Sequence, residues 1–391
     1  MYTSTPDPDQ FHRVATPPAV GHTRPMTATP LRLELRTRLE SLGPEWDRLV
    51  STSELPSPFL KSWWVDHAAG GEAAILCCFE GSRLVGGAAF ELDHVRRGPV
   101  RTERVRCVGQ GELAPDHLDL IAAPGHESDV LELVLGWLRR PGSRLVDLDG
   151  LAATGSLAQA LVANELDRIG APYTPLPSTG EEYLASRPGQ LRSTITRARK
   201  RFAKEGVQLR RVEIDDIERA LDQLAALHDE RWSEESDFLR AWDRCRAAAV
   251  AGAALHEVVI HELVSSDGEV VATELDLRCG PRLAFYQAGR RIEREWRGCG
   301  SVLRAGLVDR ACAEGLDEYD LLRGDERYKA DWAGERRELV HCRVGVGVIG
   351  RFFDGAERLR RRATPGIDRI RVELSPAPWR RRRGTRDELS D

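Results

Sequence analysis

The sequence contains almost no lysine. Of its 57 basic residues only four are lysine, at positions 61, 200, 204 and 329. Lysine carries a compact ammonium group whose pKa shifts on burial more readily than that of arginine. A specific role for some of these four side chains is one interpretation, and chance retention is the other.

The sequence also has no C-x-x-C pair and no cluster of histidine and cysteine at the spacing of zinc ligands. Its eight cysteines are scattered at positions 77, 78, 107, 245, 279, 299, 312 and 342. We therefore expect no metal. We interpret the cysteines as small buried hydrophobic residues in a reducing compartment.

Long apolar runs are missing as well. No run approaches the roughly 18 apolar residues that span a bilayer, and the first 30 residues lack the order of a secretory signal. These absences predict a soluble cytoplasmic protein without a transmembrane segment. With 41% hydrophobic residues, 30% charged residues and a net charge of −5, the composition is globular and argues against wholesale binding of polyanions.

The two ends of the chain differ in composition from the rest. Residues 1–30 are rich in proline, threonine and aspartate, which predicts a disordered leader. Residues 351–391 form an arginine-rich tail, with ten arginines between positions 358 and 383. The tail either contacts anionic lipid or RNA weakly, or is a solvated and dispensable extension.

Between these ends the chain repeats a unit, as its length beyond one typical domain suggests. Short turns at 80–82 and at 266–268 each join two β-rich runs, so both predict hairpins. The strand-like "LVDLDGL" (145–151) in the first copy corresponds to "EYDLLRG" (318–324) in the second. We therefore predict an α/β (α+β) fold of two mixed-sheet units, at residues 31–177 and 178–350.

A basic helix opens the second unit. "LRSTITRARKRFAKEG" (191–206) carries six basic side chains and stops at Gly206, a favourable helix C-cap. Such a helix is usually a solvated face. Its place at the mouth of the second unit also makes it a candidate for holding a phosphate-bearing substrate.

A strand, a glycine turn and a helix follow one another between residues 282 and 315. Gly298 and Gly300 would let backbone N–H groups approach a ligand at the positive end of the helix. Four arginines in the same turn suit a pyrophosphate better than a lone carboxylate. The pattern predicts a site that binds an anion. The arginines of this turn are Arg290, Arg291, Arg294 and Arg297.

The stretch "YDLLRGDERYKADW" (319–332) ends the next strand in a dense group of charges. In open α/β sheets, ligands bind outside the carboxyl ends of the strands. Gly324 would allow a tight turn that brings the following carboxylates back over such a site. The first copy contains no comparable group, so we place the activity in the second copy.

The pattern "FYQAGR…GCGSVL…YDLLRGDERYKADW" resembles the GNAT acyltransferases, and within them the branch typified by the cellulose-biosynthesis protein CelD, which is related to the tandem-domain Fem peptidyltransferases. The resemblance covers about residues 32–350 and is loosest in the first half. It implies a tandem GNAT fold, with a degenerate first domain, and acyl-CoA (acetyl-CoA) as co-substrate. The residues that it implies for cofactor binding are Arg294, Arg297, Gly298, Cys299, Gly300 and Ser301.

One position departs from the family pattern. Glu295 stands where the usual signature has glutamine or arginine, and an acidic side chain there would repel a pyrophosphate unless it points away. Fem relatives use aminoacyl-tRNA instead of acyl-CoA, which is the second enzymatic alternative. A third alternative is a non-catalytic accessory protein that has kept the fold.

The resemblance implies direct attack of an acceptor amine on the thioester in a ternary complex. A backbone N–H of the 282–289 strand would stabilise the oxyanion. Tyr328 would act as the acid, and Asp325 or Glu326 as the base or as the ammonium ligand. The acceptor would be a small amine or amino sugar, such as a polysaccharide or cell-envelope precursor. The expected substrate-binding residues are Glu274, Asp276, Tyr286, Gln287, Arg323 and Lys329.

Two other interpretations compete with these roles, one structural and one enzymatic. In the first, the charges at 323–329 form only an ion-pair network that closes the loop. In the other, Cys299 is a nucleophile activated by the helix terminus and by the arginines around it. No histidine has an obvious sequence relation to that cysteine, which argues against the second interpretation.

Overall fold

The computed structural model describes residues 30–363 with a gap at 233–236. The leader predicted at 1–30, apart from Pro30, and the part of the predicted tail after residue 363 lie outside the described residues. Residues 351–363 of that predicted tail are helical. Helix α12 spans Gly347–Ala363, so the limit expected between residues 350 and 351 falls inside it.

One mixed sheet contains all the strands of the described ranges. Their spatial order is β1-β2-β3-β4-β6-β13-β7-β12-β11-β10-β9-β8, and β5 pairs with β3. The strands are β1 (Arg32–Arg36), β2 (Glu72–Glu80), β3 (Arg83–Arg97), β4 (Val100–Cys107), β5 (Ile121–Ala122), β6 (Arg144–Ala152), β7 (Glu165–Pro175), β8 (Gln208–Arg211), β9 (Val258–Val264), β10 (Val270–Cys279), β11 (Arg282–Arg290), β12 (Glu318–Asp320) and β13 (Glu335–Val346).

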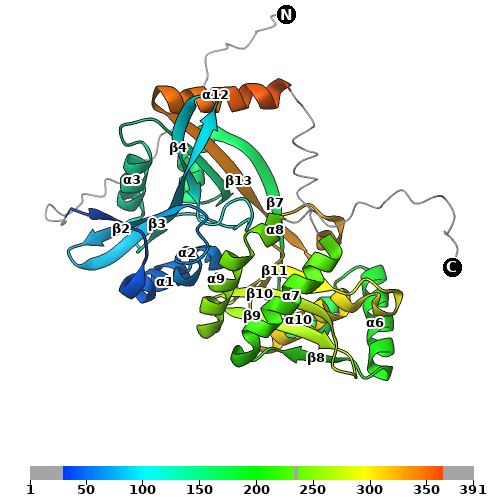
Figure 1. Cartoon of the computed structure of the whole chain (residues 1–391). Helices are drawn as coiled ribbons and strands as arrows, with labels where there is room; N and C mark the ends of the chain where they lie inside the picture. Colours follow the sequence, from blue (N-terminus) through cyan, green and yellow to red (C-terminus); the bar gives the residue numbers. More distant parts are fainter. Residues whose placement is uncertain (1–29, 233–236, 364–391) are drawn as a thin grey trace, which may run out of the picture. The chain divides into compact units, whose positions relative to one another are not determined.

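Helices cover this sheet and join its strands (Figure 1). Short 3-10 turns include one at Arg294–Trp296. The helices are α1 (Gly43–Ser51), α2 (Ser62–Val65), α3 (Glu127–Leu138), α4 (Ser156–Ala160), α5 (Gly180–Ala185), α6 (Gly189–Lys204), α7 (Ile217–Trp232), α8 (Asp237–Arg240), α9 (Trp242–Ala254), α10 (Cys299–Ala313), α11 (Arg327–Trp332) and α12.

The topology repeats, as the sequence predicts. In the first half β2, β3 and β4 are antiparallel neighbours, and β6 then pairs with β4 in parallel after helix α3. In the second half β9, β10 and β11 are antiparallel, and β12 pairs with β11 in parallel after helix α10. Both predicted hairpins are confirmed, and the chain has the predicted α/β fold in two copies.

The two copies share strands. β7 ends the first half, yet it pairs with β12 of the second half as well as with β13. β13 ends the second half, yet it lies between β6 and β7. The sheet therefore continues across the boundary expected between residues 177 and 178.

Close packing on both faces of β3 explains two glycines in the first half. A Cβ on Gly87 would lie 2.7 Å from the Trp46 ring of α1, and one on Gly86 would lie 2.6 Å from Val130 of α3. Successive residues of a strand point to opposite faces. Helices α1 and α3 therefore cover opposite faces of the sheet, at a distance that only glycine permits.

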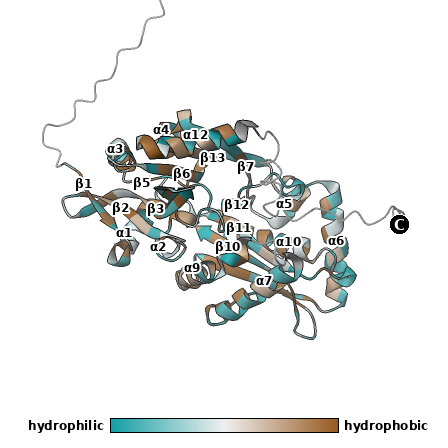
Figure 2. Cartoon of the chain, turned by 45° about the horizontal axis from the view of Figure 1, so that its top comes forward, coloured by the Kyte–Doolittle hydropathy of each residue, from teal (hydrophilic) through white to brown (hydrophobic). Residues whose placement is uncertain are grey.

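Helices also cover both faces of the second half. In Figure 2, α7 and α9 lie on one side of β10, and α10 lies on the other. Leu275 of β10 belongs to the same hydrophobic cluster as Leu221 and Leu224 of α7, whereas Ala272 belongs to a separate cluster with Leu303 of α10. Each face thus has its own apolar layer.

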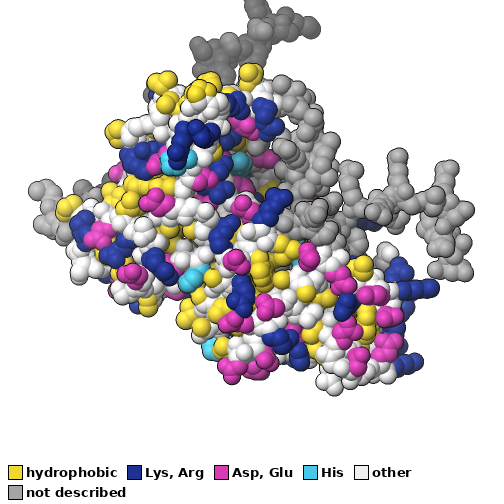
Figure 3. Space-filling view, in the orientation of Figure 1, with side chains coloured by type: hydrophobic (Ala, Val, Ile, Leu, Met, Phe, Trp, Pro, Cys, Tyr) yellow, Lys and Arg dark blue, Asp and Glu magenta, His cyan; other side chains and the backbone are white. Residues whose placement is uncertain are grey.

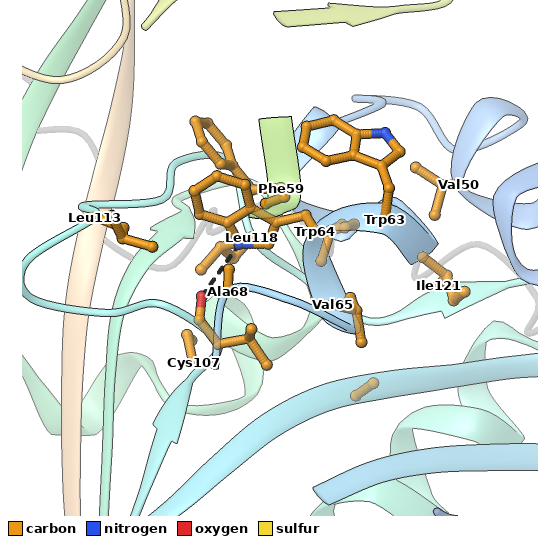
Figure 4. Packing of buried hydrophobic residues seen from close by; sticks show 14 of the residues in the cluster. Val50, Phe59, Trp63, Trp64, Val65, Ala68, Cys107, Leu113, Leu118 and Ile121 are labelled. Atoms are coloured by element: carbon orange, nitrogen blue, oxygen red, sulfur yellow. Dashed lines mark hydrogen bonds between the residues drawn. The ribbon is translucent and has the colours of Figure 1, made fainter. Parts of the chain in front are cut away.

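The halves meet through a large hydrophobic cluster (Figure 4). Phe59 and Trp64 come from the first half, and their rings lie 5.6 and 5.7 Å from the ring of Tyr286 in the second. Lys61, one of the four lysines, is buried beside them and forms an ion pair of 2.6 Å with Glu257. All eight cysteines are buried, as expected.

Candidate functional site

The candidate site begins where β11 and β12 part. Their parallel pairing runs only from Arg282 with Glu318 to Ala284 with Asp320, and β11 then continues to Arg290 without a ladder partner on that side among the described strands. The β10–β11 ladder skips Tyr286, which leaves a β-bulge there. A bulge redirects backbone groups at a functional edge. This stretch of β11 is the one from which an oxyanion partner is expected.

The N-terminus of α10 lies at the end of the following turn. Gly298 holds the N-cap position with φ +90°, a conformation that glycine adopts without strain. The first turn of α10 contains no acidic residue, so its free N–H groups and the positive end of the helix dipole are not neutralised from within the turn. Arg294, Glu295 and Arg297 are exposed in this turn, and Gly300 and Ser301 are half-buried.

Helix α6 lies directly beside this helix terminus. A Cβ on Gly298 would be 3.1 Å from the Cβ of Ala198, and Arg201 donates a hydrogen bond of 2.5 Å to the carbonyl of Arg297. Gly206, with φ +72°, follows the end of α6, as predicted. The helix adds positive charge to the turn. Its exposed basic residues are Arg192, Arg197, Lys200 and Lys204.

The equivalent terminus in the first half is closed. Helix α3 begins with Glu127, whose Oε2 accepts a hydrogen bond of 2.9 Å from the N–H of Gly125. Glu127 and Asp129 give the first turn of α3 negative charge, which repels a phosphate. The two copies therefore differ at the position that matters for anion binding.

A buried polar group lies beneath α10. Arg304 of α10 forms an ion pair of 3.1 Å with Glu274, and the hydroxyl of Tyr319 donates a hydrogen bond of 2.7 Å to the same carboxylate. The Arg304 guanidinium also lies 4.0 Å from the ring of Phe285 and 5.6 Å from that of Tyr328. Neither Arg304 nor Tyr319 was predicted for the site, because only the fold brings them to Glu274.

Tyr328, the expected acid, lies on α11 next to this group. Burial raises the pKa of its hydroxyl to about 12, although the neighbouring Arg304 opposes the shift. The hydroxyl is consequently protonated throughout the physiological range. A protonated phenol at this place is able to donate a proton.

Asp276 is buried two residues after Glu274 on the same face of β10. Neither of its carboxylate oxygens has a hydrogen-bond partner. Burial raises its pKa well above the usual range, and the charge of Glu274 adds to the shift. His261 lies opposite Glu274 in the sheet, and burial lowers its pKa to about 3. Burial thus favours the neutral form of both groups, which belong to the interior under α10.

The expected acceptor groove of Glu274, Asp276, Tyr286 and Gln287 does not form as one surface. Asp276 pairs with Phe285 across the sheet and faces α10, whereas Gln287 pairs with Leu275, which packs against α7. The hydroxyl of Tyr286 donates a hydrogen bond of 2.9 Å to the carbonyl of Leu113 in the first half. The bulge sends Tyr286 into the junction between the halves (Figure 4 shows Phe59, Trp64 and Leu113 there).

Arg323 is not free to bind substrate, because the structure pairs it with the first half. Its backbone N–H donates to Asp116 over 2.6 Å, its side chain forms an ion pair with the same carboxylate, and a second ion pair of 2.7 Å joins it to Asp149. Lys329 is buried, donates to the carbonyl of Arg323 and lies 3.3 Å from Glu326. Burial lowers the pKa of Lys329 despite the nearby carboxylates.

The remaining charges of this stretch divide into an exposed and a buried set. Asp325 is exposed and forms an ion pair of 2.8 Å with Arg336. The Oε2 atom of Glu326 is buried and lies 3.3 Å from the ammonium nitrogen of Lys329. The interpretation as an ion-pair network thus describes the contacts of Arg323, Lys329, Asp325 and Glu326.

Asp320 at the end of β12 joins a second network that the sequence did not predict. His117 Nε2 of the first half lies 2.8 Å from one of its oxygens, and Arg282 donates to that oxygen over 2.8 Å. Burial alone would raise the pKa of Asp320, but these partners lower it to about 2. No local motif marks His117, since its partner is about 200 positions away.

Cys299 does not have the properties of a nucleophile. Its thiol is buried, and burial raises its pKa despite the nearby Arg290. Reactive cysteines are accessible and have lowered pKa values. Among the described residues no group of three or more potential ligands could hold a metal ion. No helix in the described ranges is long and apolar enough to cross a membrane.

Comparisons with known proteins show what the chain is similar to. Residues 189–330 match the family model of the acetyltransferase (GNAT) domain. The crystal structure of FemX is 12% identical, with a TM-score of 0.55, and the match covers 76% of this chain and 95% of that one. A conserved protein of unknown function from Bacteroides thetaiotaomicron VPI-5482 is 9% identical, with a TM-score of 0.56 and coverage of 80% and 99%. No curated protein sequence matches the chain.

These matches support different statements. The family model covers the second half only, from α6 to α11, and identifies an acetyltransferase (GNAT) domain there. The two structures match across both halves, but at such low identity they show the fold alone. The acetyltransferase (GNAT) domain therefore lies in the second half of a two-copy fold.

Proposed function

We propose that the protein transfers an acyl group from acyl-CoA to an amine acceptor, with the reaction in its second half. The observation that carries this proposal is the uncapped N-terminus of α10 beside the unpaired edge of β11, within the residues that match the acetyltransferase domain. Gly298, Cys299, Gly300 and Ser301 would offer backbone N–H groups to the pyrophosphate. Arg294 and Arg297 would add positive charge.

The donor set fits a phosphate. The first turn of α10 lacks acidic residues, and the neighbouring helix α6 has four exposed basic side chains. Glu295, the departure from the family pattern, is exposed in the turn. Solvent weakens the repulsion between an exposed carboxylate and a bound pyrophosphate.

The residues after β12 would carry the proton transfers. The amine nitrogen attacks the thioester carbonyl carbon, a C–N bond forms, and the C–S bond breaks. Glu326, which lies beside Lys329, would accept the ammonium proton, and Tyr328 would give its proton to the leaving thiolate. An N–H of β11 at the bulge would stabilise the oxyanion. Asp325, exposed beside Arg336, would attract the acceptor's ammonium group.

The proposal extends to the acceptor as a class. We propose an amine on a polysaccharide or cell-envelope precursor, on the resemblance of the Gly324–Lys329 pattern to the CelD-like branch. Arg323 and Lys329 would support the loop that carries Glu326 and Tyr328, since both are held by the contacts described above.

Isothermal titration with acetyl-CoA and with longer acyl-CoAs tests the donor. A Gly300→Val variant should lose binding, because a Cβ at Gly300 would already lie 3.3 Å from Arg290, and the larger side chain would crowd the anion site. Gly136→Val is a matched control, since a Cβ at this glycine of α3 meets nothing within 4 Å. Equal affinity in all three proteins would contradict the anion site.

Aminoacyl transfer from tRNA is a second candidate, favoured by the basic face of α6 beside the candidate site. RNA binding of this kind weakens steeply with salt. Filter binding of tRNA at 50 and 200 mM salt separates the two proposals. Salt-sensitive tRNA binding, together with no heat of binding from any acyl-CoA, would favour aminoacyl transfer. The absence of both tRNA binding and acyl-CoA binding would favour an accessory protein without catalysis.

A further inference from the structure

Helix α12 covers the edge of the first half, where it packs on β13 and β6 (Figure 1). Gly350 makes this contact close, because a Cβ there would lie 2.0 Å from the carbonyl oxygen of Arg144. The side of α12 that contains Gly350 and the buried Phe353 therefore faces the sheet. The opposite side faces solvent.

Helix α12 carries acidic side chains toward the protein and apolar side chains toward solvent. Its side toward the protein carries Asp354 and Glu357, whose side chains are 18% and 17% exposed. Its outer side carries Val348, Phe352 and Leu359, which are 83%, 52% and 68% exposed. At 100° per residue these three side chains lie in one stripe along the helix.

Arginine side chains lie on α12 together with this apolar stripe. Arg351 is exposed, and Arg360 is 40% exposed and forms an ion pair of 2.8 Å with Glu357. Residues 351–391 hold 12 arginines against seven acidic residues, a net charge of +5 in a chain whose total is −5. Figure 3 shows the yellow side chains of this edge with dark blue ones beside them.

A second group of arginines lies at the same end of the molecule. The tip of the β3–β4 hairpin carries exposed arginines at 96, 97 and 101. Thr102 donates a hydrogen bond of 3.0 Å to the carbonyl of Ser143, and a Cβ on Gly347 would lie 2.8 Å from the hydroxyl of the same serine. The hairpin tip and the start of α12 are therefore neighbours.

We propose that α12 and this hairpin tip bind the surface of an anionic lipid bilayer. The stripe of Val348, Phe352 and Leu359 enters the boundary between headgroups and acyl chains, with the helix in the plane of the membrane. The arginines attract acidic headgroups, and each one that lies within a Debye length of the membrane surface adds to the binding free energy. RNA would leave the apolar stripe in water, and a second copy would place arginine against arginine. The bilayer is the partner that matches both features.

Flotation of the full chain with vesicles tests this proposal. We expect binding to vesicles of phosphatidylcholine with a quarter phosphatidylglycerol, little binding to pure phosphatidylcholine, and loss of binding at high salt. The triple variant Val348→Ser, Phe352→Ser, Leu359→Ser should partition about tenfold less or weaker still. Leu255→Ser, at a residue 52% exposed at the end of α9, is the matched control and should bind as the unchanged protein does.

A second measurement does not depend on the triple variant. The eight native cysteines are buried, so a Phe352→Cys variant can be labelled there with a fluorophore that brightens in an apolar environment. We expect brightening with the acidic vesicles only. No brightening, binding to RNA without vesicle binding, or a concentration-dependent dimer that the triple variant abolishes would each overturn the proposal.

Discussion

Arg323→Met is the most informative change at the junction of the two halves. The arginine comes from the second half, and its guanidinium pairs with Asp116 and Asp149 of the first. Asp116 is fully buried, and the Arg323 side chain is 20% exposed. Methionine keeps much of the volume of the side chain but leaves two carboxylates without their cation.

The expected loss is large for one residue. Breaking a buried ion pair by removing one partner costs about 3–5 kcal/mol, because the other charge stays buried and uncompensated. The Asp149 side chain is 27% exposed, so water partly screens its charge. We therefore expect a loss of about 3 kcal/mol in the free energy of unfolding, near the lower end of that range.

Urea titration at pH 7 measures this loss. Arg336→Met is the control, because Arg336 forms an ion pair of similar length with Asp325, but both side chains are more than half exposed. Such surface pairs contribute about 1 kcal/mol or less. Asp149→Asn added to Arg323→Met should restore part of the stability, since it removes one of the uncompensated charges.

The dependence of the free energy of unfolding on pH tests whether the loss comes from the ion pair. Burial favours the neutral form of Asp149, but Arg323 lowers its pKa below the usual 3.8. A lowered pKa contributes stability above the unfolded value that is lost as the pH falls. The difference between the unchanged protein and Arg323→Met should accordingly shrink below about pH 4. A cost no larger than that of the control, or a constant difference down to pH 2, would refute the ion-pair argument.

Three further variants test the site. Tyr328→Phe should lower kcat about 10- to 100-fold with little change in KM, measured in acyl-transfer assays, since it removes the proposed acid and no binding group. Cys299→Ala should keep full activity, and thiol reagents should modify Cys299 slowly in the folded protein, because burial raises its pKa. Asp276→Asn should be as stable as the unchanged protein at pH 7 or more stable, by thermal unfolding. The raised pKa of Asp276 means that ionisation costs stability as the pH rises, and a clear loss would indicate a paired, charged carboxylate instead.

Much of the fold was predictable because its signals are local. The hairpin turns at 80–82 and 266–268, the glycine after α6 and the glycine turn before α10 all lie next to the elements that they end or begin. The repeat was visible for the same reason. Its two copies show the same order of hairpin, helix and strand.

The contacts of the site residues were not predictable, because they depend on pairings across the halves. From the sequence alone Arg323 was predicted to bind substrate, but the fold pairs it with Asp116 and Asp149. Tyr286 was predicted to line the acceptor groove, but a one-residue bulge turns it toward Leu113. A register shift of one residue changes the face of the sheet, and no sequence period records it.

The exchange of strands between the halves has a consequence for synthesis. β13 joins partners roughly 190 positions apart, so the chain must wait for its last strand before the sheet of the first half is closed. Until then β6 and β7 would leave the ribosome with open edges, which are prone to mispairing. A chaperone that holds nascent chains should therefore protect this protein until residues 335–346 are made, and messages truncated before them should yield insoluble fragments of both halves.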